Sequence, residues 1–403
     1  MRNKISKIKK TGPRIALAVA LAMAAAGSAQ AADDSGLEFH GYSRGGPVLN
    51  YQDNIKGGLS LGGDLQKFRL GNEGDNGIEF SIGKTYDNQG TKYRVEYMPS
   101  KWGNGAVGTE QAYVEITGMS FSPEAKVWAG QRRLRIQDVH IVDNFLLNYG
   151  DNEGVGFTNV PLGGVRLGVG LFSGEKFDTP MPNGVKANRL NADFSDIQTN
   201  PGGKLRVLLN SVSGSGLAGD QNGSGVALLH NQQDFLASGL NNALYLQTSR
   251  GHARIDGEFL NIDGVGGGRT VTRIADAINW QIGAFGGQAL LAYQNNRDEL
   301  TDVTTKDTSL GGRISYAFSK NFKLLFEGST TKREAVAGDQ QLSKYTIAPT
   351  ISVGEGFWER PEIRFYFTQS SWNDAAAAAN AASFGANGRT STTIVGAQYE
   401  IWW

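Results

Sequence analysis

The sequence predicts an all-β protein, a single antiparallel β-barrel that spans a membrane. Three observations predict it. The chain begins with the pattern of an export signal, and its remaining residues alternate between apolar and polar in short segments. After that signal, no apolar run reaches the ~18 residues that a membrane helix needs. A sheet that spans lipid closes into a barrel, because closure gives every backbone group a partner on a neighbouring strand.

Residues 1–31 have the layout of a secretory signal peptide. Residues 1–14 hold six basic side chains and no acidic one, Ile15–Ala26 is apolar, and Ala29–Ala31 is a small-x-small cleavage site. The apolar run is 12 residues long, too short to span a bilayer as a helix. We therefore expect a signal peptide at 1–31 and one barrel domain at 32–403. An uncleaved anchor helix is the alternative.

The composition excludes several classes of function. The 39 Lys and Arg balance the 39 Asp and Glu, but six of the basic residues lie in the first 14 positions. Residues 32–403 therefore carry a net charge near −6 (33 − 39), which does not suit a nucleic-acid binder. With no Cys and only four His, we expect neither a bound metal nor a cofactor.

Short alternating segments predict the strands. Their apolar faces oppose faces that carry full charges, as an outward face toward lipid and an inward face toward a wet lumen require. Roughly 18 candidate strands follow from this pattern. Clear examples are Leu37–Arg44, Gly77–Gly83, Tyr93–Met98, Val165–Leu171 and Ile363–Thr368.

The predicted connections fall into two sizes, as in outer-membrane barrels, where short turns lie on one side and long loops on the other. The short ones are Gly118–Glu124, Ser249–Ala253, Gly283–Gln288 and Phe318–Phe322. The long ones are Arg135–Val155, Phe172–Ala187, Ser213–Asn241 and Asn373–Thr392.

Strand alternation places aromatic side chains on the charged, inward faces. Tyr42 shares its face with Arg44, and Trp402 shares its face with Glu400. Trp358 falls on the same alternation as the charged residues that follow it. Closure of the barrel pairs the first and last strands, so we expect Tyr42 and Trp402 to be neighbours. The alternatives are aromatics of the membrane interface and charges that only brace the lumen.

Six blocks along the chain resemble, in order, signatures of the maltoporin family of sugar porins. The resemblance implies an 18-stranded, homotrimeric outer-membrane barrel with a constriction loop folded into the pore. It also implies an aromatic path, the greasy slide, on which sugar rings stack while polar residues bind their hydroxyls. The blocks are FHGYSRGG (Phe39–Gly46), KFRLGNE (Lys67–Glu73), VWAGQR (Val127–Arg132), DVHIVD (Asp138–Asp143), WERPEIR (Trp358–Arg364) and GAQYEIWW (Gly396–Trp403).

The resemblance also implies substrate-binding residues. Matches to the slide are Tyr42, Trp358 and Trp402, and matches to the polar track are Arg44, Arg69, Glu79, Asp138 and Asp143. Phe145 stands where the inward loop has a tyrosine, and Arg135 adjoins Ile136, which replaces an arginine. Further departures are Gly77 and Ala243 in place of slide aromatics, with Tyr245 near the latter, and Thr109 in place of an arginine.

The expected function is facilitated diffusion of oligosaccharides of the maltodextrin type through the bacterial outer membrane, without enzymatic activity. The alternatives are a general diffusion porin and a porin retuned to another saccharide. A catalytic barrel is disfavoured, because none of the four His has an evident Ser partner. Asp138 and Asp143 could hold their loop against the wall instead of contacting sugar. The long loops leave open a role as a phage receptor.

Overall fold

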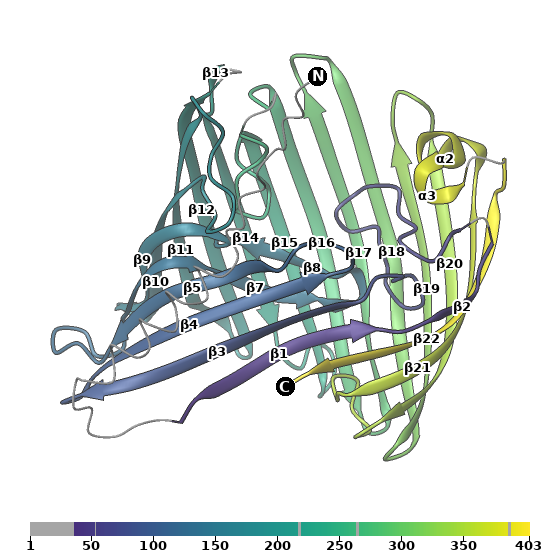
Figure 1. The fold of residues 1–403 in the computed structure, drawn as a ribbon, viewed down its shortest axis with the longest axis horizontal. Coiled ribbons are helices and arrows are strands. Elements are labelled where there is room, and N and C mark those ends of the chain that lie inside the picture. The colour runs from purple at the N-terminus through teal and green to yellow at the C-terminus, as the bar shows by residue number, and fades with distance from the viewer. Residues whose placement is uncertain (1–35, 53, 217–218, 263–265, 386–387) are drawn as a thin grey trace, which may run out of the picture.

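Strand β1 (Glu38–Gly45) pairs with the last strand, β22 (Ser391–Trp402), and closes an antiparallel sheet into a barrel (Figure 1). The computed structural model describes residues 36–403 except 53, 217–218, 263–265 and 386–387. The predicted signal peptide, residues 1–31, lies outside the described residues. None of the helices that the structure describes is long and apolar enough to cross a membrane.

The wall contains the predicted number of strands. Of the 22 strands in the described residues, all but β2, β7, β8 and β13 belong to it, which leaves 18. Successive wall strands are antiparallel neighbours. Between β1 and β22 they are β3 (Gly77–Asn88), β4 (Thr91–Trp102), β5 (Gly108–Thr117), β6 (Lys126–Arg132), β9 (Asn152–Leu162), β10 (Val165–Ser173), β11 (Lys186–Asn200), β12 (Gly203–Gly216), β14 (Gly223–Gln232), β15 (Leu240–Gly251), β16 (Arg269–Ile282), β17 (Phe285–Asp298), β18 (Val303–Ser319), β19 (Phe322–Glu334), β20 (Gln340–Ser352) and β21 (Glu362–Trp372).

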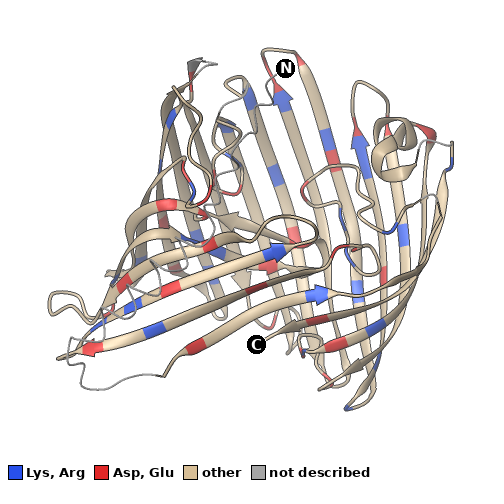
Figure 2. Ribbon diagram, in the orientation of Figure 1, with Lys and Arg blue, Asp and Glu red and all other residues tan. Residues whose placement is uncertain are grey.

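The two faces of the wall differ as the alternation predicts. In β21 the apolar side chains of Ile363, Phe365 and Phe367 are exposed, while Glu362 and Arg364, which alternate with them, are buried. Charged residues recur along many wall strands (Figure 2). An exposed apolar face and a buried charged face are the arrangement of a barrel in lipid.

Two predicted connections differ from the structure. Ser213–Asn241 is not one long loop, because β13 (Gly219–Asp220) and β14 lie within it. The Gly- and Ser-rich start of β14 has the composition of a loop. The predicted short turn Ser249–Ala253 begins a longer connection, since β16 starts only at Arg269. Asn373–Thr392 is a long connection, as expected, and it holds two short helices, α2 (Asp374–Ala379) and α3 (Ala381–Phe384).

Two long connections pack against the buried faces of the wall. The 133–151 segment, between β6 and β9, contains β7 (Arg135–Val139), the short helix η2 (His140–Val142) and β8 (Asn144–Asn148), and its apolar side chains cluster with those of β12 and β14–β17. The 51–76 segment follows β2 (Val48–Asn50) and clusters with side chains of β19–β22. The sequence predicts an inward loop only for the first of these.

A buried lysine fastens the 51–76 segment to the wall. The Nζ of Lys344, in β20, donates to the carbonyl oxygens of Leu59 at 3.1 Å and Phe68 at 2.7 Å, and also to that of Lys67. Backbone carbonyls in an irregular segment need such partners when water is excluded. Lys344 therefore fixes the path of this segment against the wall.

Candidate functional site

A cavity of about 850 Å³ lies where the two inward-packed segments meet the closing strands. Nine of the ten predicted site residues line it, and Trp358 does not. The nine are Tyr42, Arg44, Arg69, Glu79, Arg135, Asp138, Asp143, Phe145 and Trp402.

Strand register brings the first and last parts of the chain together at this cavity. Tyr42 in β1 is opposite Trp402 in β22 on one side and Glu79 in β3 on the other. The predicted proximity of Tyr42 and Trp402 is confirmed. Two residues further along β1, Arg44 is likewise opposite Glu400 in β22 on one side and Gly77 in β3 on the other.

We call the junction where β1 pairs with β22 the seam. The aromatic rings lie along the seam, but protein groups cover part of them. The Arg360 guanidinium lies 4.3 Å from the centre of the Trp402 ring. His140 meets Trp402 edge-on at 5.7 Å between ring centres, and meets Trp358 at 5.5 Å. Trp358 lies in the turn before β21, with 39% of its surface exposed. His140 therefore stands between Trp402 and Trp358.

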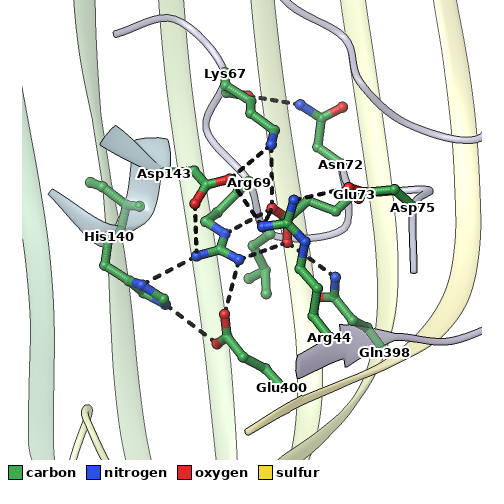
Figure 3. A network of polar contacts seen from close by, with 12 residues as sticks. Arg44, Lys67, Arg69, Asn72, Glu73, Asp75, His140, Asp143, Gln398 and Glu400 are labelled. Atoms are coloured by element: carbon green, nitrogen blue, oxygen red, sulfur yellow. Dashed lines mark hydrogen bonds and ion pairs between the residues drawn. The ribbon is translucent and has the colours of Figure 1, made fainter. Parts of the chain in front are cut away.

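Arg44 and Arg69, two of the three predicted basic residues, belong to a dense ionic network (Figure 3). Arg69 contacts Glu73 and Glu400, each at 3.0 Å, and its side chain is 2% exposed. Arg44 contacts Glu73 at 2.6 Å and Asp143 at 3.0 Å. Both guanidinium groups thus have protein carboxylates as partners, which agrees with the bracing alternative.

Asp143 is the member of this network that also reaches the open space, with 35% of its side chain exposed. Burial alone would raise the pKa of Asp143, but the cations of Arg69, Arg44 and Lys67 hold it well below its usual range. The ionised carboxylate joins the 133–151 segment to β1 and to the 51–76 segment. Asp143 therefore holds its loop in place, whatever it also binds.

The remaining predicted side chains that line the cavity have other partners. Glu79 pairs with Arg133 at 2.9 Å, and Arg135 pairs with Asp151 at 2.9 Å. The Arg135 guanidinium also lies 5.5 Å from the Phe145 ring centre. On the seam side, Asp138 is 3.1 Å from the Nδ1 of His140.

Several cavity residues are absent from the sequence prediction. Trp102 has a signal that could have found it, because the alternation that turns Arg94 and Glu96 inward also turns Trp102 inward. The residues from the 252–268 connection had none, since that connection looked like a short turn. The missed residues include Trp102, Glu110, Arg133, Arg254, Asp256 and Glu258.

Glu258 makes the stability of the protein depend on pH. Burial, together with the charges of Asp256 and Asp151, raises the pKa of Glu258 from 4.5 to about 8. Over this range the folded protein keeps a proton that the unfolded chain has lost, so stability falls as pH rises from 4.5 to about 8.

Glu258→Gln should remove that dependence. We expect the variant to match the parent protein near pH 5 and to unfold at a higher temperature near pH 8.5, because Gln keeps the uncharged form. Thermal unfolding followed by circular dichroism measures both. Glu124→Gln is the control, since Glu124 is exposed. A Glu258→Gln variant that is less stable than its parent at the higher pH would contradict the assignment.

A closed barrel with an apolar outer face and a charged cavity at its inner seam defines the class of bacterial outer-membrane β-barrel channels, the porins. Residues 37–403 match the family described as LamB porin, and the chain belongs to that family. Maltoporins of two Vibrio cholerae serotype O1 strains, N16961 and O395, are each 27% identical to it over 442 aligned positions, which cover 96% of this chain and 98% of theirs.

Solved structures with a similar fold are more distant. OpdK of Pseudomonas aeruginosa, crystallised with vanillate, has a TM-score of 0.49 at 11% identity, covering 91% of this chain and 98% of its own. The outer-membrane channel DcaP of Acinetobacter baumannii has a TM-score of 0.48 at 12% identity, covering 91% of this chain and 97% of its own.

Proposed function

We propose that this porin conducts oligosaccharides of the maltodextrin type by letting them stack on the aromatic rings of the barrel seam. The observation that carries the proposal is the cross-strand pair of Tyr42 and Trp402, which lines a cavity rich in ionic groups. The relatives named maltoporin support the same substrate class. The proposed activity is passive, and members of this family are channels and not enzymes.

The chemistry of the cavity suits a sugar. A pyranose ring has an apolar C–H face, for which an aromatic ring is a platform, and a rim of hydroxyls that donate and accept hydrogen bonds. Carboxylates such as Glu79 accept from hydroxyls, and guanidinium groups such as that of Arg135 donate to them. Contacts spread over several such sites bind strongly enough to enrich a solute and weakly enough to release it.

The two inward-packed segments give the channel its proposed constriction. They border a cavity of about 850 Å³. A constriction of this kind would force the solute against the seam, where the aromatic side chains are.

A general diffusion porin is the second candidate, and two observations favour it. Arg360 covers part of the Trp402 ring, and Gly77 offers no ring of its own. A porin of that class would show ionic conductance that sugars do not block. The homotrimer and the phage-receptor role remain predictions from the resemblance alone.

Trp402→Ala should weaken block of the ion current by maltohexaose by about 1–3 kcal/mol, if sugar stacking is comparable to base stacking. Tyr42→Ala should have an effect of similar size. Tyr42→Phe separates the ring from the hydroxyl, which binds Glu400 at 2.9 Å, and should keep most of the block. Planar-bilayer current measures the block constant.

The control for these variants is Tyr345→Ala, which removes an exposed ring of β20. Block constants for Trp402→Ala and Tyr42→Ala that equal the control would remove both residues from the conduction path.

A further inference from the structure

The indole of Trp102 lies across a neighbouring strand toward the seam. Trp102 ends β4 and is opposite Gly77 of β3, which is opposite Arg44 of β1. These three positions form one row perpendicular to the strands. The Trp102 ring centre is nevertheless 4.9 Å from the Arg44 guanidinium carbon and 6.1 Å from the Tyr42 ring centre. The indole therefore spans the width of β3.

Gly77 makes this crossing possible. A Cβ atom built on Gly77 would lie 1.9 Å from a ring carbon of Trp102, far inside van der Waals contact. The backbone of Gly77 does not have the positive φ that favours glycine, so space and not conformation explains the residue. Any side chain at this position would displace the indole.

The position of Gly77 is one at which the family resemblance implies a slide aromatic. This chain has no aromatic residue at that sequence position. The space above Gly77 nevertheless holds an aromatic ring, because the ring of Trp102 occupies it and lines the cavity. A residue of the next strand thus replaces a side chain of β3.

Trp102 extends the aromatic path beyond Tyr42. The Trp102 and Tyr42 rings are inclined by only 30°, and Tyr42 continues to its strand partner Trp402. Hydrogen-bonding groups accompany the indole, since Glu79 lies in the adjacent row and Glu110 also lines the cavity. An aromatic face beside carboxylates fits an uncharged sugar with free hydroxyls.

We infer that Trp102 is a sugar-stacking residue of the channel, with the space for its ring provided by Gly77. The inference rests on the proposed function and adds to it a third ring on the same path. It assigns a binding role to a residue at a position where no aromatic was expected.

Block by maltohexaose in planar bilayers tests the inference with the parent protein, three variants and one control. Trp102→Ala should weaken the block about tenfold or more. Trp102→Phe should keep most of it. The double variant Trp102→Gly with Gly77→Tyr returns a ring to the same space from β3, and should recover the block to within about threefold of the parent.

Trp280→Ala is the matched control. Trp280 in β16 lies across Gly287 of β17 in the same way, with a ring carbon 2.2 Å from a Cβ built on that glycine, but it does not line the cavity. Its removal should leave the block constant unchanged. Both Trp280→Ala and Trp102→Ala delete an indole that covers a glycine. The control should therefore show the same general loss of stability, if there is one.

The outcomes separate the inference from the proposed function. A parent protein that no maltohexaose concentration blocks would overturn the proposed function. A blocked parent with equal block constants in Trp102→Ala and Trp280→Ala would overturn the inference alone, as would a double variant that recovers nothing.

Discussion

Replacing Glu400 by Gln should lower the free energy of unfolding by about 3–5 kcal/mol. The Glu400 side chain is 0% exposed and accepts contacts from Arg69 at 3.0 Å and Arg360 at 2.9 Å, and also from Arg364. Gln keeps the shape but not the charge, so the three guanidinium groups would lose the carboxylate that they share and keep only Glu73 or Glu362 as a buried partner. Removing one partner from such a site costs more than the net contribution of the pair.

Glu400 also connects parts of the chain that are far apart in sequence. It lies in β22, while Arg69 belongs to the 51–76 segment and Arg360 to the turn before β21. We therefore expect the variant to lose cooperativity at the seam, where the barrel closes. Urea unfolding in phospholipid, followed by tryptophan fluorescence, measures the change.

Glu334→Gln is the matched control for this prediction. Glu334 pairs with Lys332 at 3.0 Å, but its side chain is 42% exposed, and exposed ion pairs contribute little to stability. Equal free energies of unfolding for Glu400→Gln and Glu334→Gln would contradict the role of Glu400 as the central anion.

Lys344→Met should have the second large effect, a loss of about 3 kcal/mol together with a higher single-channel conductance. The variant removes the charged donor from the carbonyl oxygens of Leu59, Lys67 and Phe68, which keep only the Asn72 amide as a donor. Hydrogen bonds to a charged group contribute about 1.5–3 kcal/mol. The segment should then leave the wall for part of the time, so that more of the lumen conducts ions.

Planar-bilayer recordings at fixed salt measure this conductance. Lys306→Met is the control, because Lys306 in β18 is 45% exposed and its ion pair with Glu334 is long, at 3.6 Å. A Lys344→Met channel with the parent's conductance and stability would show that the segment does not depend on Lys344 for its position.

Much of the fold follows from the sequence because membrane strands obey one simple alternation. At Ile363–Thr368 the apolar residues are the exposed ones, as predicted. The closure of a barrel then brings Tyr42 to Trp402 without any knowledge of the intervening loops, since the first and last strands must pair.

The lumen could be predicted only in part, because its contacts join residues that no local pattern relates. The apolar residues of the 51–76 segment are spaced among glycines without a strand or helix period, so nothing local shows that they pack inward. The anchoring lysine, Lys344, is 285 residues away from Leu59, whose carbonyl it binds. Arg44 and Arg69 were predicted as cavity residues, but not their shared partner Glu73.

The central claim is that the seam aromatics make this barrel a sugar channel. Single-channel conductance in a planar bilayer, titrated with maltohexaose and then with sucrose, tests it most directly. We expect saturable block by maltohexaose, as stacking along Trp102, Tyr42 and Trp402 requires. Ionic conductance that neither sugar reduces would contradict the claim and would identify a general diffusion pore.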